Sequence, residues 1–226
     1  MFVMDIFNGE VVHAVRGERS RYEPVDRISR VVSSSDPLEI IGEVKPEEVY
    51  VADLNRLTGS GDNLDLIEEI SHKTGTMADI GISDLSDLEL LTGSVKPVLG
   101  TETSSVKLIE DAARSRRIIL SIDMKSRKTL TKDPSMMIEP LDLLAKLNDI
   151  DLEAVILLDL HRVGTSSGLD TGFLEESRAV SRHTLILGGG VKGVEDIKAL
   201  EDLGFSGVLV ATAVHNGKIP LSMLQR

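Results

Sequence analysis

Short runs of Val, Ile and Leu recur along the chain, and each is followed by a polar or amphipathic stretch. The runs lie near residues 2–6, 48–54, 76–80, 96–100, 117–123, 154–160, 184–188 and 207–211. Apolar residues are continuous within each run rather than alternating, which is typical of strands covered on both faces, as in a parallel sheet. The pattern therefore predicts a series of parallel strands.

Apolar residues at helical spacing lie between several of these runs. They predict helices over 64–70, 106–113 and 194–203, and a short first helix over Pro37–Val44. Short polar side chains precede several helical or polar stretches and are the predicted N-caps: Asp62, Asp84, Ser104 and Asp170. Strand–helix alternation in units of about 28 residues predicts an α/β fold, a (βα)8 TIM barrel, a fold usually built from about 250 residues. A doubly wound open sheet is the alternative.

The sequence also contains an internal repeat. The paired segments are 53–62 with 159–170, 79–83 with 188–192, 98–101 with 209–212, and Asp5 with Asp123. Four pairs in the same order, roughly 110 residues apart, indicate two homologous halves, about 1–115 and 116–226 of one domain. The repeat favours the barrel over the open sheet, because four units plus four units close symmetrically.

Composition narrows the class of protein. The 226 residues are 41% hydrophobic but only 3% aromatic, with no Trp and no Cys, which predicts an aliphatic core without disulfides or thiol chemistry. No segment reads as a membrane span or a secretion signal, so a cytoplasmic protein is expected. A net charge of −12 argues against a nucleic-acid partner. A small anionic ligand remains compatible, because a few backbone N–H groups bind a phosphate locally.

Two carboxylates occupy matching places in the repeat. Asp5 and Asp123 each end an aliphatic run, and the active sites of barrels lie where strands end. Facing carboxylates suit paired acid and base chemistry if their environments differ. Either residue alone is better explained as a loop cap or an ion-pair partner, but the symmetric pair favours catalysis.

Glycines follow the seventh strand and small residues follow the eighth. Gly189 and Gly190, with Ala211 and Thr212, lie in the two loops that usually bind phosphate in this fold. Glycine permits close approach of backbone N–H groups to an anion, although a tight turn would need it equally. The first-half counterparts are Gly81, Gly100 and Thr101, and here the nearby Asp79 and Glu102 would repel phosphate. One strong and one degraded phosphate site are expected.

Three polar loops are further candidates. Segments 16–35 and 126–135 follow the first and fifth strands and are either substrate lids or surface loops. The loop 162–168 follows the sixth strand and offers small polar residues, of which Thr165 or Ser166 could hold a sugar. His13 is a weaker candidate contact, and the histidines show no metal-ligand spacing.

Taken together, these motifs resemble the histidine-biosynthesis barrel family, which includes ProFAR isomerase and the cyclase subunit of imidazole glycerol phosphate synthase. Residues 5–12 resemble the family's opening, an Asp, a polar-Gly turn and a Val-Val strand, and Ile122-Asp123 resembles its second catalytic Asp. Residues 162–168 resemble its R-D-G-T-x-S-G loop, and 188–191 with 195–197 resemble its second phosphate loop. The resemblance covers nearly the whole chain and implies a barrel of the ribulose-phosphate-binding type.

The resemblance implies roles for particular residues. In ProFAR isomerase an aminoaldose becomes an aminoketose by Amadori rearrangement, without a cofactor or metal. Carried over, Asp5 is the base, Asp123 the acid, and Thr165 holds sugar hydroxyls. The implied phosphate and substrate contacts are Gly81, Gly100, Thr101, Gly164, Ser166, Gly168, Gly189, Gly190, Ala211 and Thr212.

The chain departs from the family pattern at several of these places. Asp79 stands in the first phosphate loop, Ala211-Thr212 replaces a G-R pair, and Val163 replaces an Asp. The chain most resembles a ProFAR-isomerase-related group of methanogenic archaea and C1-metabolising bacteria.

Three functions therefore compete. The first is an isomerase of a phosphorylated sugar or aminosugar. The second is a related enzyme of C1-carrier biosynthesis acting on a singly phosphorylated substrate, and the third is a non-catalytic phosphometabolite-binding barrel. The expected partner is a small phosphorylated molecule, without nucleic acid or membrane, and the protein is expected to be a monomer or homodimer.

Overall fold

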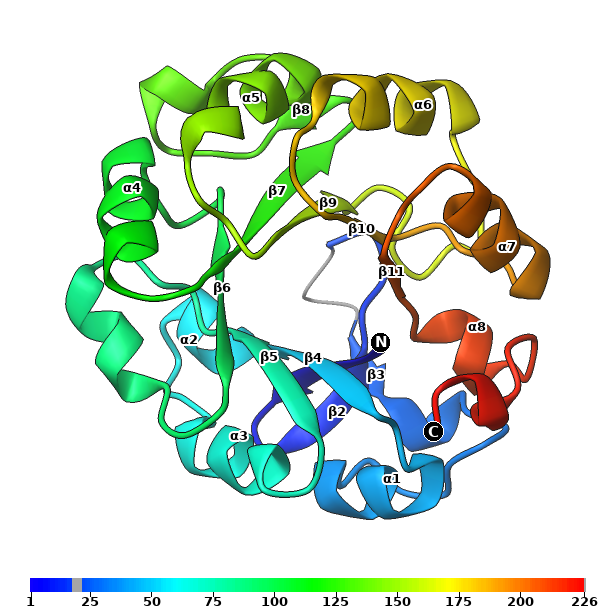
Figure 1. Cartoon of the computed structure of the whole chain (residues 1–226). Helices are drawn as coiled ribbons and strands as arrows, with labels where there is room; N and C mark the ends of the chain where they lie inside the picture. The colour runs from blue at the N-terminus through cyan, green and yellow to red at the C-terminus, as the bar shows by residue number, and fades with distance from the viewer. Residues whose placement is uncertain (18–21, 226) are drawn as a thin grey trace.

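A closed ring of parallel strands forms the centre of the molecule (Figure 1). The computed structural model describes residues 1–17 and 22–225. The parallel strands are β1 (Phe2–Phe7), β4 (Glu48–Asp53), β5 (Gly75–Asp79), β6 (Lys96–Gly100), β7 (Ile119–Lys125), β9 (Ala154–Asp159), β10 (Leu185–Gly188) and β11 (Gly207–Leu209). Each matches one of the predicted aliphatic runs.

The ring closes between the first and the last strand. The Val3 N–H donates to the Val210 carbonyl (3.0 Å), and the Val210 N–H donates to the Met1 carbonyl (3.0 Å). Phe2 and Val210 form a parallel bridge. Closure confirms the barrel and excludes the doubly wound open sheet, which would leave both edges unpaired.

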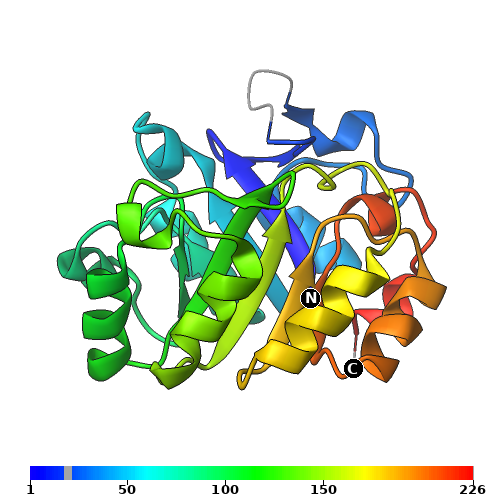
Figure 2. The same ribbon diagram turned by 90° about the horizontal axis from the view of Figure 1, so that it is seen from above.

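Helices surround the ring (Figures 1 and 2). They are α1 (Pro37–Val44), α2 (Leu54–Thr58), α3 (Leu64–Ser71), α4 (Val106–Ser115), α5 (Pro140–Lys146), α6 (Thr171–Val180), α7 (Val194–Asp202) and α8 (Thr212–His215). Between β5 and β6 the chain forms only a 3-10 helix, η3 (Leu85–Leu90). The predicted helices correspond to α1, α3, α4 and α7. None of the described helices has the length and apolar character needed to cross a membrane.

The predicted N-caps are half correct. The Asp84 side chain caps η3 and the Asp170 side chain caps α6. Asp62 and Ser104 each lie one residue before the N-cap position. That position is taken by Asn63 in α3, without a side-chain capping bond, and by Ser105 in α4, whose side chain accepts from the Leu108 N–H. The Ser104 hydroxyl instead donates to the Gly100 carbonyl (2.6 Å), which tightens the turn after β6.

Two hydrophobic clusters explain the continuous apolar runs. One lies between the strands and the helices and includes Val49 and Val51 of β4. The other fills the barrel interior and includes Tyr50 and Ala52 of the same strand. Alternate residues of each strand thus face different cores, so both kinds are buried.

Two excursions extend the carboxyl ends of the strands. After β1 the chain forms antiparallel β2 (Glu10–His13) and β3 (Glu23–Pro24), then the 3-10 helix η2 (Val25–Arg27). After β7 it forms β8 (Lys128–Thr129) and the 3-10 helix η4 (Pro134–Met136). The predicted loops 16–35 and 126–135 therefore contain short regular elements, although 18–21 lie outside the described residues. Figure 2 shows the first excursion rising from the face where the strand arrows end.

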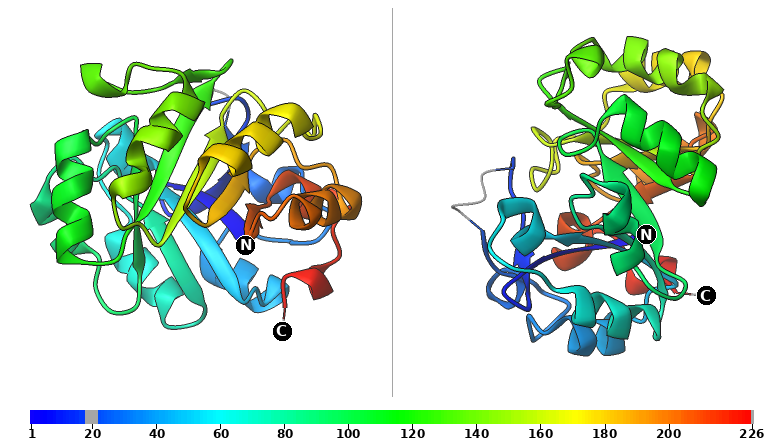
Figure 3. Two further views of the ribbon diagram at one scale, coloured as in Figure 1. Left: turned by 45° about the horizontal axis from the view of Figure 1, so that its top comes forward. Right: turned by 90° about the vertical axis from the view of Figure 1, so that its left-hand side faces the viewer.

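The C-terminal segment returns to the first helix. The Gln225 side-chain amide donates to the Val44 carbonyl (2.7 Å), and the Glu47 N–H donates to the Leu224 carbonyl (2.7 Å). The segment that contains Leu224 and Gln225 therefore lies beside the connection from α1 to β4, at the red end of the chain in Figure 3.

Candidate active site

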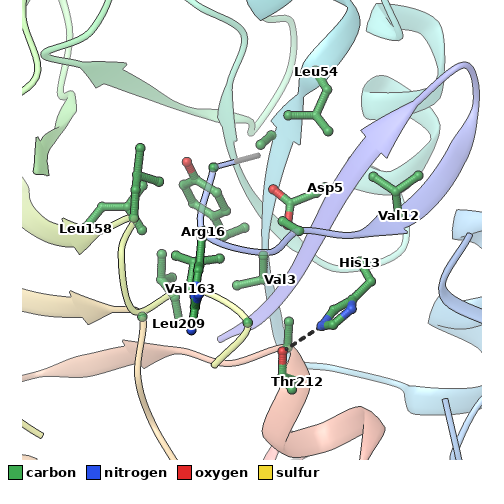
Figure 4. Close-up of a pocket in the computed structure, with 18 of the residues that line it drawn as sticks. Val3, Asp5, Val12, His13, Arg16, Leu54, Leu158, Val163, Leu209 and Thr212 are labelled. Atoms are coloured by element: carbon green, nitrogen blue, oxygen red, sulfur yellow. Dashed lines mark hydrogen bonds between the residues drawn. The ribbon is translucent and has the colours of Figure 1, made fainter. Parts of the chain in front are cut away.

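A cavity of about 360 Å³ opens among the residues at the carboxyl ends of the strands. Its wall is largely aliphatic, and its carboxylates are Asp5, Asp79, Glu102 and Asp123. The repeat predicts that Asp5 and Asp123 share a site, and both line this one cavity. Figure 4 shows Asp5 on β1 among Val3, Leu54 and Val163.

Asp123 is held rigidly near the end of β7. The residue is 5% exposed. The Ser121 hydroxyl donates to Oδ1 (2.7 Å), and the Glu102 N–H donates to Oδ2 (3.2 Å). The Asp123 N–H in turn donates to the Thr101 hydroxyl (3.0 Å). The carboxyl group is therefore positioned both by its own strand and by the turn after β6.

The surroundings of Asp123 shift its pKa toward neutral pH. Its pKa is raised from 3.8 to about 7, first by burial and second by the charge of Asp79. Hydrogen bonds from Ser121 and Glu102 act in the opposite direction, because they stabilise the ionised form. A carboxyl group with this pKa is partly protonated at neutral pH and can donate a proton.

Gly100 makes room for the two buried carboxylates. A Cβ atom at this position would lie 2.8 Å from Oδ2 of Asp123 and 3.3 Å from Oδ2 of Asp79. Both oxygens thus converge on the space that a side chain would fill. Any larger residue at position 100 would displace the pair.

Tyr50 and Asp79 belong to this centre, although the sequence pointed to Asp79 only as a group that repels phosphate. Tyr50 points into the barrel interior from β4 and donates a hydrogen bond to Asp79. Burial raises the pKa of the Tyr50 hydroxyl well above 10, and the charges of Asp79, Asp123 and Asp5 raise it further. Tyr50 thus remains a neutral donor. Its place within a hydrophobic run gave no sign of a polar role.

The small residues after β10 and β11 form the opposite wall of the cavity. Gly189, Gly190, Ala211 and Thr212 all line it. Gly189 and Gly190 adopt positive φ (99° and 89°), and a Cβ on either would lie within 2.8 Å of a backbone oxygen. No hydrogen bond among the described residues engages the N–H groups of Gly190, Thr212 or Ala213. These N–H groups could therefore donate hydrogen bonds to a bound anion.

The first-half counterparts are arranged differently. Gly100 lines the cavity, but Gly81 and Thr101 do not. The Gly81 N–H donates to Oδ1 of Asp79 (2.9 Å), and the Thr101 hydroxyl supports Asp123. Thr101 therefore contacts Asp123 and does not line the cavity.

The loop after β9 reaches across to the excursion after β1. Gly164 and Ser166 line the cavity, whereas Thr165 and Gly168 lie outside its lining. The Thr165 hydroxyl donates to the Arg162 carbonyl (2.7 Å), so it stabilises the loop. Oγ of Ser166 is buried and has no hydrogen-bond partner among the described residues. Ser166 therefore lines the cavity and has a hydroxyl without a partner within the described residues, whereas the Thr165 hydroxyl is engaged within its own loop.

Two histidines flank Thr212. Nε2 of His13 lies 3.2 Å from the Thr212 hydroxyl (Figure 4), and Nδ1 of His215 lies 3.0 Å from the Ser29 hydroxyl. Burial lowers the pKa of His13. Burial, and then the neighbouring His13, lower the pKa of His215 to about 4. The sequence suggested His13 only weakly, because the strand that returns it to the cavity is short.

Within residues 1–17 and 22–225, the ring of eight parallel strands, with polar residues at its carboxyl end, places the chain among the (βα)8 barrels. Within that class the chain belongs to the histidine biosynthesis protein family, which it matches over residues 1–220. The resemblance seen in the sequence is thereby confirmed.

Individual relatives cover almost the whole chain. An uncharacterized protein of Methanocaldococcus jannaschii is 30% identical over 97% of this chain and 94% of its own. Two ProFAR isomerases are also similar to this chain. Their full name, an imidazole-4-carboxamide isomerase, contains two phosphoribosyl groups. That of Nautilia profundicola is 28% identical over 99% of this chain and 96% of its own. That of Thermus thermophilus is 25% identical over 96% of this chain and 94% of its own.

Proposed function

We propose that this protein is an aldose–ketose isomerase that converts a phosphorylated aminoaldose to the aminoketose by Amadori rearrangement. The observation that carries the proposal is the pairing of Asp5 and Asp123 in one cavity, with the pKa of Asp123 raised to about 7. Two carboxyl groups in unlike environments are what sequential acid and base steps require.

Asp123 acts first, as the general acid. Its proton passes to the ring oxygen of the sugar, the bond from C1 to that oxygen breaks, and the nitrogen lone pair forms a protonated imine at C1. Burial keeps this carboxyl group protonated in part of the population at neutral pH. Ser121 and the Glu102 N–H then stabilise the carboxylate that remains.

Asp5 acts second, as the general base. It removes the C2 proton, and the electron pair of that bond forms the C1–C2 double bond as the imine nitrogen becomes neutral. Transfer of a proton to C1 and loss of the enol proton complete the ketose. Half-buried on β1, Asp5 retains contact with the cavity and its ligand.

The phosphate of the substrate binds at the β10–β11 wall. The N–H groups of Gly190, Thr212 and Ala213 are available as donors, and the Thr212 hydroxyl and His13 lie beside them. Anchoring the phosphate fixes the sugar relative to Asp5 and Asp123, which lowers the entropic part of the barrier. Ser166 offers a hydroxyl to the sugar.

The test compares wild type with Asp5→Asn and Asp123→Asn. Turnover of ProFAR is followed by absorbance, and exchange of the C2 proton with solvent deuterium is followed by NMR for ProFAR and singly phosphorylated aminoaldoses. Each variant is expected to lose about 10²–10⁴-fold in rate while remaining folded. Asp151→Asn, an exposed residue that precedes β9, is the matched control. Equal rates in wild type and both variants would refute the assignment.

A further inference from the structure

The two ends of the cavity differ in what their backbone N–H groups can still bind. The sequence repeat pairs Gly81 with Gly190, and both have positive φ (68° and 89°). The Gly81 N–H is used by Oδ1 of Asp79 (2.9 Å), whereas the Gly190 N–H has no partner among the described residues. The same backbone conformation therefore has an occupied N–H group at the β5–β6 end, called the closed end, and, within the described residues, an unoccupied one at the β10–β11 end.

The next pair of turns repeats this difference. After β6 the Thr101 N–H donates to the Ser121 carbonyl (2.9 Å), and the Glu102 N–H donates to Asp123 (3.2 Å). Their counterparts after β11, Thr212 and Ala213, make no such bonds within the described residues. By contrast, Ser83 and Lys192 each donate to an Asp four residues later, so these N–H groups do not distinguish the ends.

The closed end also carries carboxylates, whose negative charge repels phosphate. Asp79 is buried at the carboxyl end of β5, and Glu102 and Asp123 line the cavity around it. The field of Asp79 is strong enough to raise the pKa values of both Asp123 and Tyr50. A phosphate dianion placed there would meet like charges in a poorly solvated site and find its donors already taken.

We infer that Asp79 is a specificity-determining residue that excludes a phosphate from the β5–β6 end, so that the substrate carries a single phosphate. This inference rests on the proposed function. The named relatives act on a compound with two phosphoribosyl groups. Here the backbone donors compared above are without partners, within the described residues, at the β10–β11 wall and are taken at the β5–β6 end. The cationic side chains that line the cavity, Arg16 and Lys125, belong to the segment after β2 and to β7, not to β5 or β6. The opposite end of the substrate carries hydrogen-bond donors, such as hydroxyls or a protonated amine, in place of the second phosphate.

The experiment titrates the 15N-labelled full-length chain with inorganic phosphate at constant ionic strength. Amide resonances of Gly190, Thr212 and Ala213 are expected to shift saturably, and those of Gly81 and Glu102 to stay fixed. The double variant Asp79→Gly/Glu102→Gln removes both charges and frees the Gly81 N–H. Saturable shifts of the residue 81 and 102 amides should then appear at least about tenfold below any concentration that affects them in wild type. Asp151→Asn should behave as wild type.

The outcomes separate the inference from the function on which it rests. If the Gly81 and Glu102 amides of wild type shift in parallel with those of Gly190 and Thr212, the inference is overturned. It is also overturned if the double variant, shown to be folded by its dispersed spectrum, gains no site. Absence of shifts at Gly190 and Thr212 would instead remove the phosphate wall from the proposed function, and the double variant would still decide the role of Asp79.

Discussion

The acid–base character of Asp123 depends on neighbours from several strands. Asp79 raises its pKa, Ser121 and Glu102 donate to it, and Gly100 leaves the space in which the carboxylates converge. The residue type supplies a carboxyl group, but the surroundings make it an acid at neutral pH. This is why an Asp at the end of a strand is a candidate in the sequence and a defined chemical group only in the folded chain.

His13 gives a prediction at the same scale. Replacing His13 by Leu should raise KM for a phosphorylated substrate about tenfold and change kcat little, because one hydrogen-bond donor to the phosphate is lost. Steady-state kinetics with wild type and His13→Leu measure KM and kcat separately. His72→Leu, at the C-terminal end of α3 and away from the cavity lining, is the matched control. A fall in kcat at unchanged KM would assign His13 to the chemistry instead.

At the scale of elements, the parallel strands were the most predictable part of the fold. Both faces of each strand are buried, so the sequence reads as uninterrupted aliphatic runs, and each run locates its strand within a few residues. Asp62 and Ser104 missed the caps by one position because neighbouring polar residues, Asn63 and Ser105, were equally suitable. Local propensity alone could not choose between them.

The elements also explain which site residues could be predicted. Asp5 and Asp123 were found because strand ends fix their location. The Thr165 hydroxyl donates to the Arg162 carbonyl of its own loop, whereas Ser166, which adopts a positive φ of 47°, lines the cavity. Tyr50 was missed because one aromatic residue in a buried run carries no polar signal. Loop orientation and interior polarity both arise from tertiary contacts.

The contact between two loops gives a prediction for Gly164. A Cβ there would lie 2.5 Å from the Ala14 carbonyl oxygen, and φ is +75°. Gly164→Ala should therefore lower the free energy of unfolding by about 1–3 kcal/mol and raise KM, because the loop after β9 must move from the β2 excursion. Urea denaturation and kinetics measure both effects.

Gly172→Ala is the control for that change. Gly172 lies in α6, and a Cβ there meets nothing within 4 Å. This substitution should leave stability unchanged or raise it by up to about 1 kcal/mol, as is usual for glycine in a helix. Equal effects at positions 164 and 172 would show that the loop contact tolerates a side chain.

For the whole molecule, Asp123 predicts a dependence of stability on pH. Its pKa is 3.8 in an unfolded chain and about 7 in the fold, so between these values the folded state holds the proton more tightly. The unfolding free energy should therefore fall from this source as pH rises from about 4 to about 7. Asp123→Asn should remove that part of the decline and exceed wild type in stability by about 1–3 kcal/mol at pH 8.

Urea denaturation of wild type and Asp123→Asn across this pH range provides the measurement. Asp151→Asn, which alters an exposed carboxylate, should follow the wild-type profile. Parallel profiles for wild type and Asp123→Asn would mean that the pKa of Asp123 is the same in the folded and unfolded states, near 3.8. Asp123 would then be ionised at neutral pH, which contradicts its role as the acid.

The hydrogen bond between His13 and Thr212 joins residues 199 positions apart in the chain. During synthesis the ribosome releases Asp5 and His13 first, but the wall they face is completed only when the last strand emerges. A chain that stops before β11 therefore contains His13 but lacks the Thr212 hydroxyl that His13 contacts. In the order of synthesis, the two sides of the cavity meet only late.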